Sequence, residues 1–335
     1  MSLIGVDQIM CNSKRVIVWR ITQNCNMNCL FCSYSNEVIR KRDVADYEDI
    51  LKFLKILGMY KDVSKQETLI SWIGGEPFLW DHIIPLSKEI NENYGINIST
   101  TTNGLLLSSK ETREGIVQHF SEIVFSLDGF RQCNDRIRKL NGHYEKVTKN
   151  ILQLSKEKKE AGSNLIIKVN TILMRENIES FEEFCKELVA LGVNEITFNQ
   201  LGGFDRPEFY EDNRLLYNQV KQFSSDLPRL KEKFYKMGLL IHGNDDYLGR
   251  IMSSTENKKI KIDECNPGRW FWFINENGFI SPCSYTSYEY MLHINSIKEI
   301  EDIDKVEGYF KDLRKSKRSH WCDDCHCTQL YKKFE

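Results

Sequence analysis

Residues 25–32 read Cys25-Asn26-Met27-Asn28-Cys29-Leu30-Phe31-Cys32 and place three thiols at the spacing C-x3-C-x2-C. An apolar, strand-like run at residues 16–21 comes just before them. Thiolates are soft ligands that select iron–sulfur clusters, zinc or Cu(I). Three thiolates can hold three irons of a [4Fe–4S] cluster and leave the fourth open, and an open metal position marks a catalytic site. The alternatives are a zinc site or three buried core cysteines.

Apolar runs that read as strands alternate with segments of helical spacing from this stretch to about residue 200. Gly58 is expected to help end the first helix. Such alternation implies an α/β fold with a parallel sheet and right-handed crossovers. The strands are predicted at 16–22, 68–73, 96–101, 122–127, 165–173 and 193–200, and the helices at 43–58, 80–93, 108–118, 143–161 and 178–191.

Polar motifs lie at the ends of three predicted strands. Gly74-Gly75-Glu76-Pro77 follows the second strand, Thr102-Asn103-Gly104 follows the third, and Ser126-Leu127-Asp128-Gly129 ends the fourth. Functional loops in parallel α/β barrels lie at the C-terminal ends of the strands. Each motif alone fits a turn, because Gly, Asn, Asp and Pro favour turns. Their shared position favours one site built from several loops.

The alternation stops beyond about residue 205. Residues 213–237 look helical, and Pro228 is expected to break or kink that segment. A β-hairpin is predicted from 270–274 and 279–283, and it can bring Cys265 and Cys283 together. A helical stretch at 296–316 precedes the last three cysteines, which are Cys322, Cys325 and Cys327.

Composition divides the chain into four parts. We predict an N-terminal extension at 1–14, a core at 15–205, a helical connection at 206–262 and a small α+β domain at 263–335. Cys11, Cys133 and Cys185 are isolated, and Cys185 is expected to pack in the core. His326 lies among the last thiols, where it could be a metal ligand, but it is expected at the surface.

The sequence resembles the radical S-adenosylmethionine (SAM) family over roughly residues 15–205. The resemblance implies a partial (β/α)6 TIM-like barrel, with a [4Fe–4S] cluster on Cys25, Cys29 and Cys32 whose open iron binds SAM. In that family the reduced cluster donates an electron to SAM. The C–S bond then breaks to give methionine and a 5′-deoxyadenosyl radical, which removes a hydrogen atom from the substrate. No catalytic residue is assigned beyond the cluster.

Two elements near the thiols match cofactor-binding positions of the family. Phe31 matches the aromatic residue between two ligands, near the adenine, with core packing as the alternative. Gly74, Gly75 and Glu76 match the GGEP element. Its glycines let the backbone approach a ligand closely, and Glu76 would accept a hydrogen bond from the SAM ammonium.

Three further elements match by position. Asn103 matches the TNG element, and Ser126 and Asp128 match the element after strand four, near the SAM carboxylate or ribose. Turn formation is the alternative for Asn103 and Asp128. Arg138 ends an element in which Asn134 replaces the usual His, and it would pair with the SAM carboxylate through its fork.

The C-terminal region resembles the auxiliary-cluster twitch domain, a shortened relative of the SPASM domain. Its signature fits the spacing from Cys265 through Gly278 to Cys283. The resemblance implies one auxiliary iron–sulfur cluster, and a structural zinc site is the alternative. The expected ligands are Cys265, Cys283, Cys325 and Cys327, with Cys322 as the spare or a substituting ligand.

Charge and composition narrow the partners and the compartment. A net charge of −2 gives no general electrostatic footprint for nucleic acid or an anionic membrane. No apolar run reaches transmembrane length, and no signal peptide is evident. Eleven cysteines without a secretion signal favour a reducing compartment. We expect a cytoplasmic protein that receives electrons from a donor such as flavodoxin or ferredoxin.

The resemblance implies a radical SAM oxidoreductase or maturase. The leading hypothesis is oxidative modification or crosslinking of a peptide, as in the sactipeptide maturases that form thioethers. Many such enzymes carry an N-terminal peptide-recognition domain, whereas about fourteen residues precede the first strand here. The alternative is a dehydrogenase or epimerase of a small alcohol, sugar or aminocyclitol. A non-enzymatic iron–sulfur sensor or scaffold is a hypothesis of another class, and it would not need the SAM elements.

Overall fold

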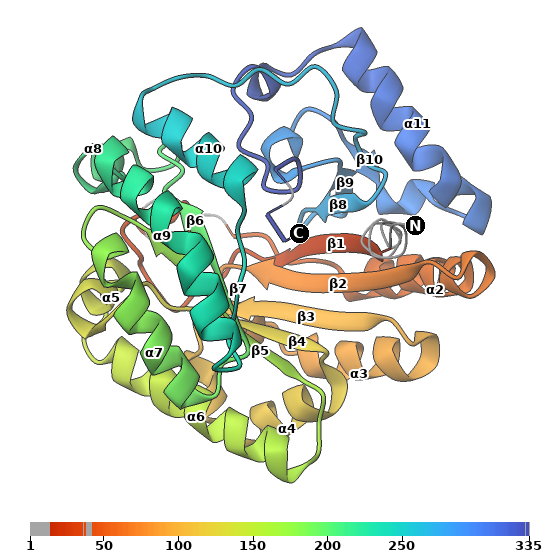
Figure 1. The fold of residues 1–335 in the computed structure, drawn as a ribbon. Helices are drawn as coiled ribbons and strands as arrows, with labels where there is room; N and C mark the ends of the chain where they lie inside the picture. Colours follow the sequence, from red (N-terminus) through yellow and green to blue (C-terminus); the bar gives the residue numbers. More distant parts are fainter. Residues whose placement is uncertain (1–13, 36, 38–41, 332, 335) are drawn as a thin grey trace, which may run out of the picture.

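One curved sheet organises the molecule. The computed structural model describes residues 14–35, 37, 42–331 and 333–334, so Cys11 lies outside the described residues. Within them the strand order is β10-β9-β8-β1-β2-β3-β4-β5-β6-β7. Neighbouring strands from β1 to β7 run parallel, and helices cover the outer face of the sheet (Figure 1). This is the partial α/β barrel expected from the sequence.

The barrel strands begin and end close to the predicted positions, because their apolar runs and bounding turn residues are local signals. Trp19 of β1 pairs in register with Trp72 of β2, and both side chains are fully buried beneath α2 with Phe53. The strands are β1 (Lys14–Thr22), β2 (Glu67–Gly74), β3 (Asn97–Thr102), β4 (Glu122–Ser126), β5 (Ile166–Leu173), β6 (Glu195–Gln200), β7 (Leu240–Ile241), β8 (Phe271–Ile274), β9 (Phe279–Ser281) and β10 (Leu292–His293).

The helices include three that the sequence analysis does not predict as separate elements: α5, α8 and α10. None of the helices in the described residues is long and apolar enough to cross a bilayer. The helices are α2 (Tyr47–Ser64), α3 (Ile83–Tyr94), α4 (Lys110–His119), α5 (Arg131–Arg138), α6 (His143–Glu160), α7 (Phe181–Leu191), α8 (Pro207–Asn213), α9 (Tyr217–Tyr235), α10 (Asp245–Thr255) and α11 (Ile300–Ser316).

One helix prediction was wrong, and another was wrong in part. Gly58 does not end the first helix: α2 continues to Ser64, and a Cβ at Gly58 would lie 2.4 Å from the Tyr94 ring. The glycine therefore permits close packing between α2 and α3. Pro228 does not break α9, which continues through it. Pro228 is on the exposed side of that helix, where solvent can reach the carbonyl left without a donor.

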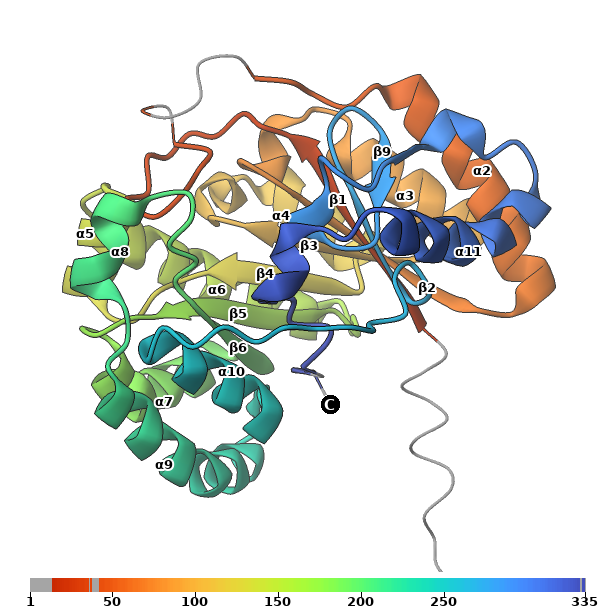
Figure 2. The same ribbon diagram turned by 90° about the horizontal axis from the view of Figure 1, so that it is seen from above.

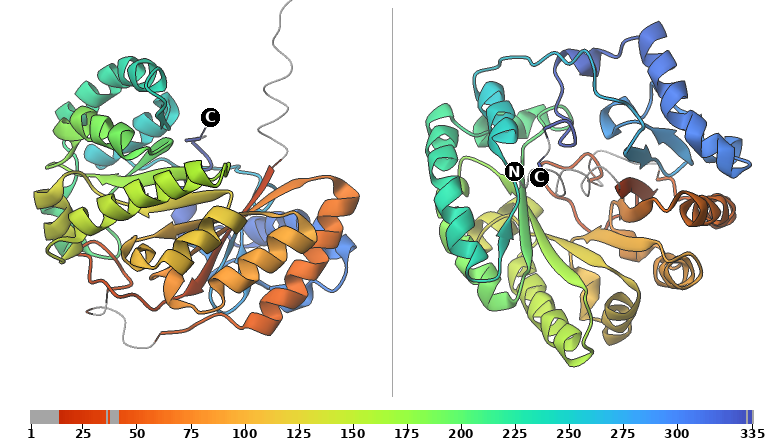
Figure 3. Two further views of the ribbon diagram at one scale, coloured as in Figure 1. Left: turned by 90° about the horizontal axis from the view of Figure 1, so that it is seen from below. Right: turned by 45° about the vertical axis from the view of Figure 1, so that its right-hand side comes forward.

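The predicted hairpin is confirmed and joins the barrel sheet. Strands β8 and β9 pair antiparallel, and β8 pairs parallel with β1, so Val16 lies opposite Phe271. Figures 2 and 3 show this hairpin beside β1, with α11 running along α2. The Tyr60 hydroxyl donates to the Asp304 carboxylate (2.7 Å) between these two helices. The C-terminal region is thus attached to the edge of the barrel at β1.

Candidate cofactor and metal site

The three thiols of the first motif lie in the loop after β1, at the edge of the sheet where parallel strands end. Cys29 is buried, and Cys25 and Cys32 are half-buried. Burial raises the pKa of Cys25 to about 11, with further increases from Glu76 and the two other thiols. Burial likewise raises the pKa values of Cys29 and Cys32. Metal binding at such thiols must displace their protons.

The Gly-Gly pair after β2 is required by the thiol loop itself. A Cβ at Gly74 would lie 2.3 Å from the Thr22 carbonyl oxygen, and one at Gly75 would lie 2.2 Å from that of Asn24. The Gly75 amide donates to the Thr22 carbonyl (2.9 Å), and the next amide donates to that of Asn24 (2.7 Å). The close approach that the glycines permit in this structure is therefore to the protein backbone at the start of the thiol loop.

Glu76 is fully buried and joins two of the motif loops. Its carboxylate accepts from the Thr102 hydroxyl and the Asn103 amide (both 2.8 Å), and from the Phe78 amide (3.2 Å). Burial raises the pKa of Glu76 to about 7, although these three donors act to lower it. A carboxylate has about four acceptor positions, so little capacity remains for a ligand without rearrangement.

Asn103 forms the turn that its residue type favours and also reaches the thiol loop. Its side-chain oxygen accepts from the Leu105 amide (3.1 Å), and its side-chain nitrogen donates to the side-chain oxygen of Asn26 (2.8 Å). Asn26 lies directly after the first thiol. The sequence analysis missed Asn26, which connects the thiol loop to the Asn103 turn. Its location between two motif cysteines was the signal that could have identified it.

Arg138 lies at the end of α5 and faces both Asp128 and the thiols. Its Nη2 donates to Asp128 (2.5 Å), and its Nη1 lies 3.9 Å from the Cys29 sulfur. Burial acts to lower the pKa of Arg138, but the Asp128 carboxylate and the Cys29 sulfur outweigh it and raise that pKa. Asp128 also accepts from the Ile172 amide (2.7 Å), which fixes the carboxylate between β4 and β5.

Phe31 and Ser126 complete the predicted set around the first thiols. Phe31 packs on a small apolar cluster that includes Ile137 and Met174, and the Arg138 guanidinium lies 5.3 Å from its ring centre. Phe31 therefore packs in the core, which was one of its two interpretations from the sequence. Ser126 is the half-buried last residue of β4 and pairs in register with Asn170 of β5.

The residues around the first thiols have the chemistry of a cluster and SAM site. The Nε of Arg138 is buried and has no hydrogen-bond acceptor among the described residues, which suits a site that receives an anionic group. Three thiols are the soft donor set that iron–sulfur clusters use. In the described residues, no three Cys, His, Asp or Glu side chains already stand in metal-binding geometry.

The sheet edge and its thiols correspond to a known family. Residues 19–188 match the family model of the Radical SAM superfamily. The chain belongs to this superfamily. The matched region contains the three thiols of the first motif and the loops after β2, β3 and β4. Membership implies a [4Fe–4S] cluster and SAM as cofactors. It also supports catalytic activity, because this is a family of enzymes.

Curated relatives cover most of the chain at low identity. The uncharacterized protein MJ0907 of Methanocaldococcus jannaschii is 26% identical over 226 residues, which are 66% of this chain and 73% of that protein. The AdoMet-dependent heme synthase of Methanosarcina barkeri is 22% identical over 288 residues, which are 82% of this chain and 78% of that enzyme.

A solved structure shares the fold over nearly the whole chain. Streptococcus suis SuiB bound to S-adenosylmethionine has a TM-score of 0.67 at 16% identity, and the match covers 96% of this chain and 72% of SuiB. SuiB bound to its precursor peptide SuiA gives a TM-score of 0.65 at 15% identity. At these identities the similarity shows a common fold.

The second set of thiols in this radical SAM protein comes from three separate segments. Cys265 precedes the hairpin and Cys283 follows it, while the other three lie in the loop after α11. Backbone hydrogen bonds join that loop to the segment before Cys265: Ile262 donates to Cys322, and Cys325 donates to Ile260 (both 2.9 Å). The structure therefore gathers all five thiols in one region.

Burial raises the pKa values of four thiols of the second set, which are Cys265, Cys283, Cys325 and Cys327. It raises the pKa of Cys325 to about 11, and the neighbouring thiols Cys283, Cys265 and Cys322 raise it further. Burial also raises the pKa of Cys327, with Cys283 and Cys325 adding to it. The Arg314 guanidinium donates to the Cys265 sulfur (3.4 Å). Which four of the five bind a metal stays a prediction.

A buried ion pair connects the hairpin turn to β1. The Arg20 Nε donates to the Glu276 carboxylate (2.5 Å), and the side chains are 6% and 2% exposed. Gln23, at the start of the thiol loop, donates to the same carboxylate (2.5 Å). Arg20 also donates to the hydroxyl of Tyr34, just beyond the first thiols. The Glu276 carboxylate therefore holds the start of the first thiol loop, and its partner Arg20 contacts the other end of that loop at Tyr34.

His326 is not at the surface, which corrects the sequence expectation. Its side chain is 12% exposed, and its ring nitrogens lie within hydrogen-bond distance of Arg250 (2.7 Å) and Gln200 (3.3 Å). Arg250 on α10 is itself buried and pairs with Asp324 (2.9 Å). These hydrogen-bonded side chains attach the last thiol loop to the end of β6. They lie too far apart in the sequence to be recognised together.

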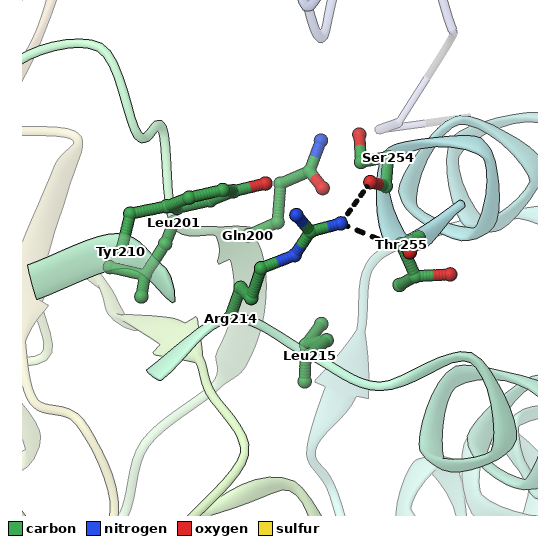
Figure 4. Close-up of a pocket in the computed structure, with 7 residues that line it drawn as sticks. All are labelled: Gln200, Leu201, Tyr210, Arg214, Leu215, Ser254 and Thr255. Carbon is green, nitrogen blue, oxygen red and sulfur yellow. Dashed lines mark hydrogen bonds between the residues drawn. The ribbon is translucent and has the colours of Figure 1, made fainter. Parts of the chain in front are cut away.

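A small pocket lies beside this attachment, between β6, α8 and α10 (Figure 4). Arg214 crosses it and donates to the carbonyls of Ser254 (2.7 Å) and Thr255 (3.0 Å). None of the predicted site residues lines this pocket. Arg214 holds the segment before α9 against the end of α10, and we assign the pocket no ligand.

Proposed function

We propose that this radical SAM enzyme oxidatively modifies or crosslinks a peptide, with a second iron–sulfur cluster in its C-terminal region. When bound, the first cluster and SAM supply a 5′-deoxyadenosyl radical that removes a hydrogen atom from the substrate. The observation that carries the proposal is the presence of two separate thiol sets in one chain, one beside the superfamily's SAM motifs and one in the segments on either side of the hairpin.

The residues of the first set have distinct proposed roles. Cys25, Cys29 and Cys32 hold the cluster. Arg138 offers its unpartnered Nε to the SAM carboxylate. Glu76 accepts from the SAM ammonium, which stabilises the carboxylate form of a group whose pKa burial has raised to about 7.

Six further residues line the proposed SAM position. The backbones of Gly74 and Gly75 hold the loop that carries the carboxylate against the thiol loop. Asn103 and Ser126 face the SAM carboxylate or ribose. Phe31 lies beside the adenine, and Asp128 fixes the arginine fork through its ion pair.

The second set is proposed to hold one auxiliary cluster through Cys265, Cys283, Cys325 and Cys327, with Cys322 as the spare or a substituting ligand. Bound there, such a cluster would accept the electron left on the substrate after hydrogen abstraction, or it would bind the substrate. The mutual effect of these thiols on each other's pKa supports their gathering at one site. Flavodoxin or ferredoxin is the proposed donor to the first cluster, and the cytoplasm is the proposed compartment.

Two comparisons support different substrate classes. The fold shared with SuiB, which has been solved with a precursor peptide, supports a peptide. The relative named as a heme synthase supports the second candidate, a small-molecule substrate, at 22% identity. The peptide is preferred because the SuiB match extends through the second thiol set, covering 96% of this chain.

The test is anaerobic reconstitution with iron and sulfide, followed by reduction with dithionite in the presence of SAM. We expect 5′-deoxyadenosine from the wild type and from Cys185→Ala, because Cys185 is buried in α7 far from both thiol sets in sequence. Cys29→Ala should form none, since one iron then lacks its thiolate. Substantial 5′-deoxyadenosine from Cys29→Ala would refute the ligand assignment.

The substrate is tested separately, with any short cysteine-rich peptide that is found encoded next to this gene. Oxidative crosslinking removes two hydrogen atoms, so mass spectrometry should show a peptide lighter by that amount and resistant to thiol alkylation. SAM cleavage without any change in such peptides would favour the small-molecule alternative.

A further inference from the structure

A ring of hydrogen bonds closes around the first thiol loop and passes through a histidine that no motif includes. From Cys29 it runs through Arg138 to Asp128, whose amide donates to the Asn134 side-chain oxygen (3.2 Å). The members of this hydrogen-bond ring are Cys29, Arg138, Asp128, Asn134, His143, Asn103 and Asn26. It returns to the thiol loop at Asn26, so both sides of that loop are attached to it.

His143 is the first residue of α6 and is fully buried. Its Nε2 lies 3.0 Å from the Asn103 carbonyl oxygen, and its Nδ1 lies 2.9 Å from the Asn134 side-chain nitrogen. A backbone carbonyl can only accept, so Nε2 must carry the proton. Nδ1 then accepts from Asn134, whose oxygen is already the acceptor for the Asp128 amide. The directions agree all along the ring and define one tautomer of the imidazole.

The surroundings keep this imidazole neutral. Burial lowers the pKa of His143 to about 4, and the positive charges of Arg138 and Lys146 act in the same direction. The Asn103 carbonyl and the Asp135 carboxylate oppose them but do not prevail. Asp135 is itself occupied by the amides of Gly142 (2.7 Å) and Tyr144 (2.8 Å). The ring therefore keeps its hydrogen-bond directions throughout the neutral pH range.

We propose that His143 is a positioning residue of the cofactor site, which holds the Asn103 loop and the Arg138 fork in register through a fixed, neutral Nε2–H ring. The inference rests on the proposed function, because the site it positions is the one assigned to the cluster and SAM. Through its contacts with Asn134 and Asn103, the imidazole of His143 connects α5 to the loop after β3.

Two substitutions separate hydrogen bonding from bulk. In His143→Gln the amide oxygen can accept from Asn134 and the amide nitrogen can donate to Asn103, so both connections survive. His143→Leu fills similar space and leaves the Asn103 carbonyl without a donor. The matched control is His119→Leu, because His119 ends α4 outside the ring, with its side chain 13% exposed.

The readout is the dissociation constant of SAM, measured by equilibrium dialysis and expressed per iron-loaded first cluster. We expect His143→Leu to weaken SAM binding about tenfold or more, as for a buried acceptor left unpaired. His143→Gln should restore affinity to within about threefold of the wild type, and His119→Leu should not change it. A purely structural role would lower the amount of loaded protein and leave this constant unchanged, which would overturn the proposal.

The tautomer is measured independently, by 15N NMR of ring-labelled histidines in the oxidised, cluster-loaded protein. The resonances of His143 are identified by their loss in His143→Gln. We expect protonated Nε2 and unprotonated Nδ1 at pH 6 to 9. A proton on Nδ1, or titration near the ordinary value of 6.5, would overturn the assignment.

The two hypotheses can fail separately. A wild type that takes up neither cluster nor SAM contradicts the proposed function, while the tautomer still tests the ring in the protein as isolated. A wild type that binds both, with unchanged SAM affinity in His143→Leu, contradicts only the positioning role.

Discussion

The guanidinium of Arg138 lies 3.9 Å from the sulfur of Cys29, although 109 positions separate these residues in the chain. The same guanidinium pairs with Asp128, and the two side chains are only 8% and 0% exposed. A buried pair of this kind is costly to break from one side, because the remaining charge has no solvent to replace its partner. The thiol loop therefore lies beside a buried ion pair that stabilises this edge of the barrel.

The first prediction concerns this pair. Arg138→Met should lower the free energy of unfolding by about 3–5 kcal/mol, because Asp128 is left buried without its partner. Arg138→Met combined with Asp128→Asn should recover part of the loss. Arg136→Met is the matched control on the same helix: its pair with Glu176 is 46% and 45% exposed, so about 1 kcal/mol or less is expected. Urea unfolding gives all three values, and equal losses in Arg136→Met and Arg138→Met would contradict the prediction.

The second prediction is a pH dependence. Burial raises the pKa of Glu76 from 4.5 to about 7, so the group is mostly protonated at pH 6 and mostly ionised at pH 8. Only the carboxylate attracts the SAM ammonium, and the affinity for SAM should therefore rise roughly tenfold between these values. Glu76→Gln should weaken binding and remove this pH dependence. Glu67→Gln, at the exposed start of β2, the strand that precedes the Glu76 turn, is the control.

The same shift has a consequence for the ligand-free protein. Between about pH 4.5 and 7 the folded state keeps a proton on Glu76 that the unfolded state has released, so stability falls as the pH rises through this range. A SAM affinity that is flat from pH 6 to 8 in the wild type would show that Glu76 serves the turn alone.

The third prediction concerns the attachment of the hairpin. Glu276→Ala leaves Arg20 buried without its carboxylate and should make amide hydrogen exchange in Phe271–Ile274 and Phe279–Ser281 at least about a hundredfold faster. Asn277→Ala, an exposed neighbour in the same turn, should leave exchange unchanged. Mass spectrometry of peptides after exchange measures both. Similar protection in the two variants would mean that the ion pair does not hold the hairpin.

The fourth prediction separates the two thiol sets. Replacing Cys283 and Cys325 together with alanine should lower bound iron by about one cluster and leave SAM cleavage intact, because neither residue belongs to the first loop. Product formation on the true substrate should vanish. Full product from a folded variant would exclude a catalytic role for the second set. Aggregation of the variant would instead indicate that the metal there contributes folding energy.

The barrel could be predicted because its signals are local. The apolar run of β1, the Gly-Gly turn after β2 and the Asn103 turn each depend on residues within a few positions. Gly58 shows the limit of local signals. A glycine near the end of an apolar helix pattern looks the same whether it ends the helix or admits a neighbouring ring, and only the position of Tyr94 distinguishes the two.

Most of the features that the sequence analysis did not predict depend on contacts between residues far apart in the chain. Helix α5 has only eight residues and few apolar side chains, so it lacks a periodic pattern although it carries Arg138. The pairing of β8 with β1 depends on an exposed strand edge that no sequence pattern specifies. The role of His143 depends on Asn134 and Asn103, which approach it from two other elements.

The parallel pairing of β8 with β1 also determines when the molecule can be completed. During synthesis on a ribosome, β1 emerges first and can pair with β2, but its other edge stays open until Phe271–Ile274 has been made. Closing such a distant contact is slow, and an open strand edge can pair with other chains in the meantime. A nascent chain halted before the hairpin should therefore bind chaperones at β1, and it should lose that binding once the hairpin has emerged.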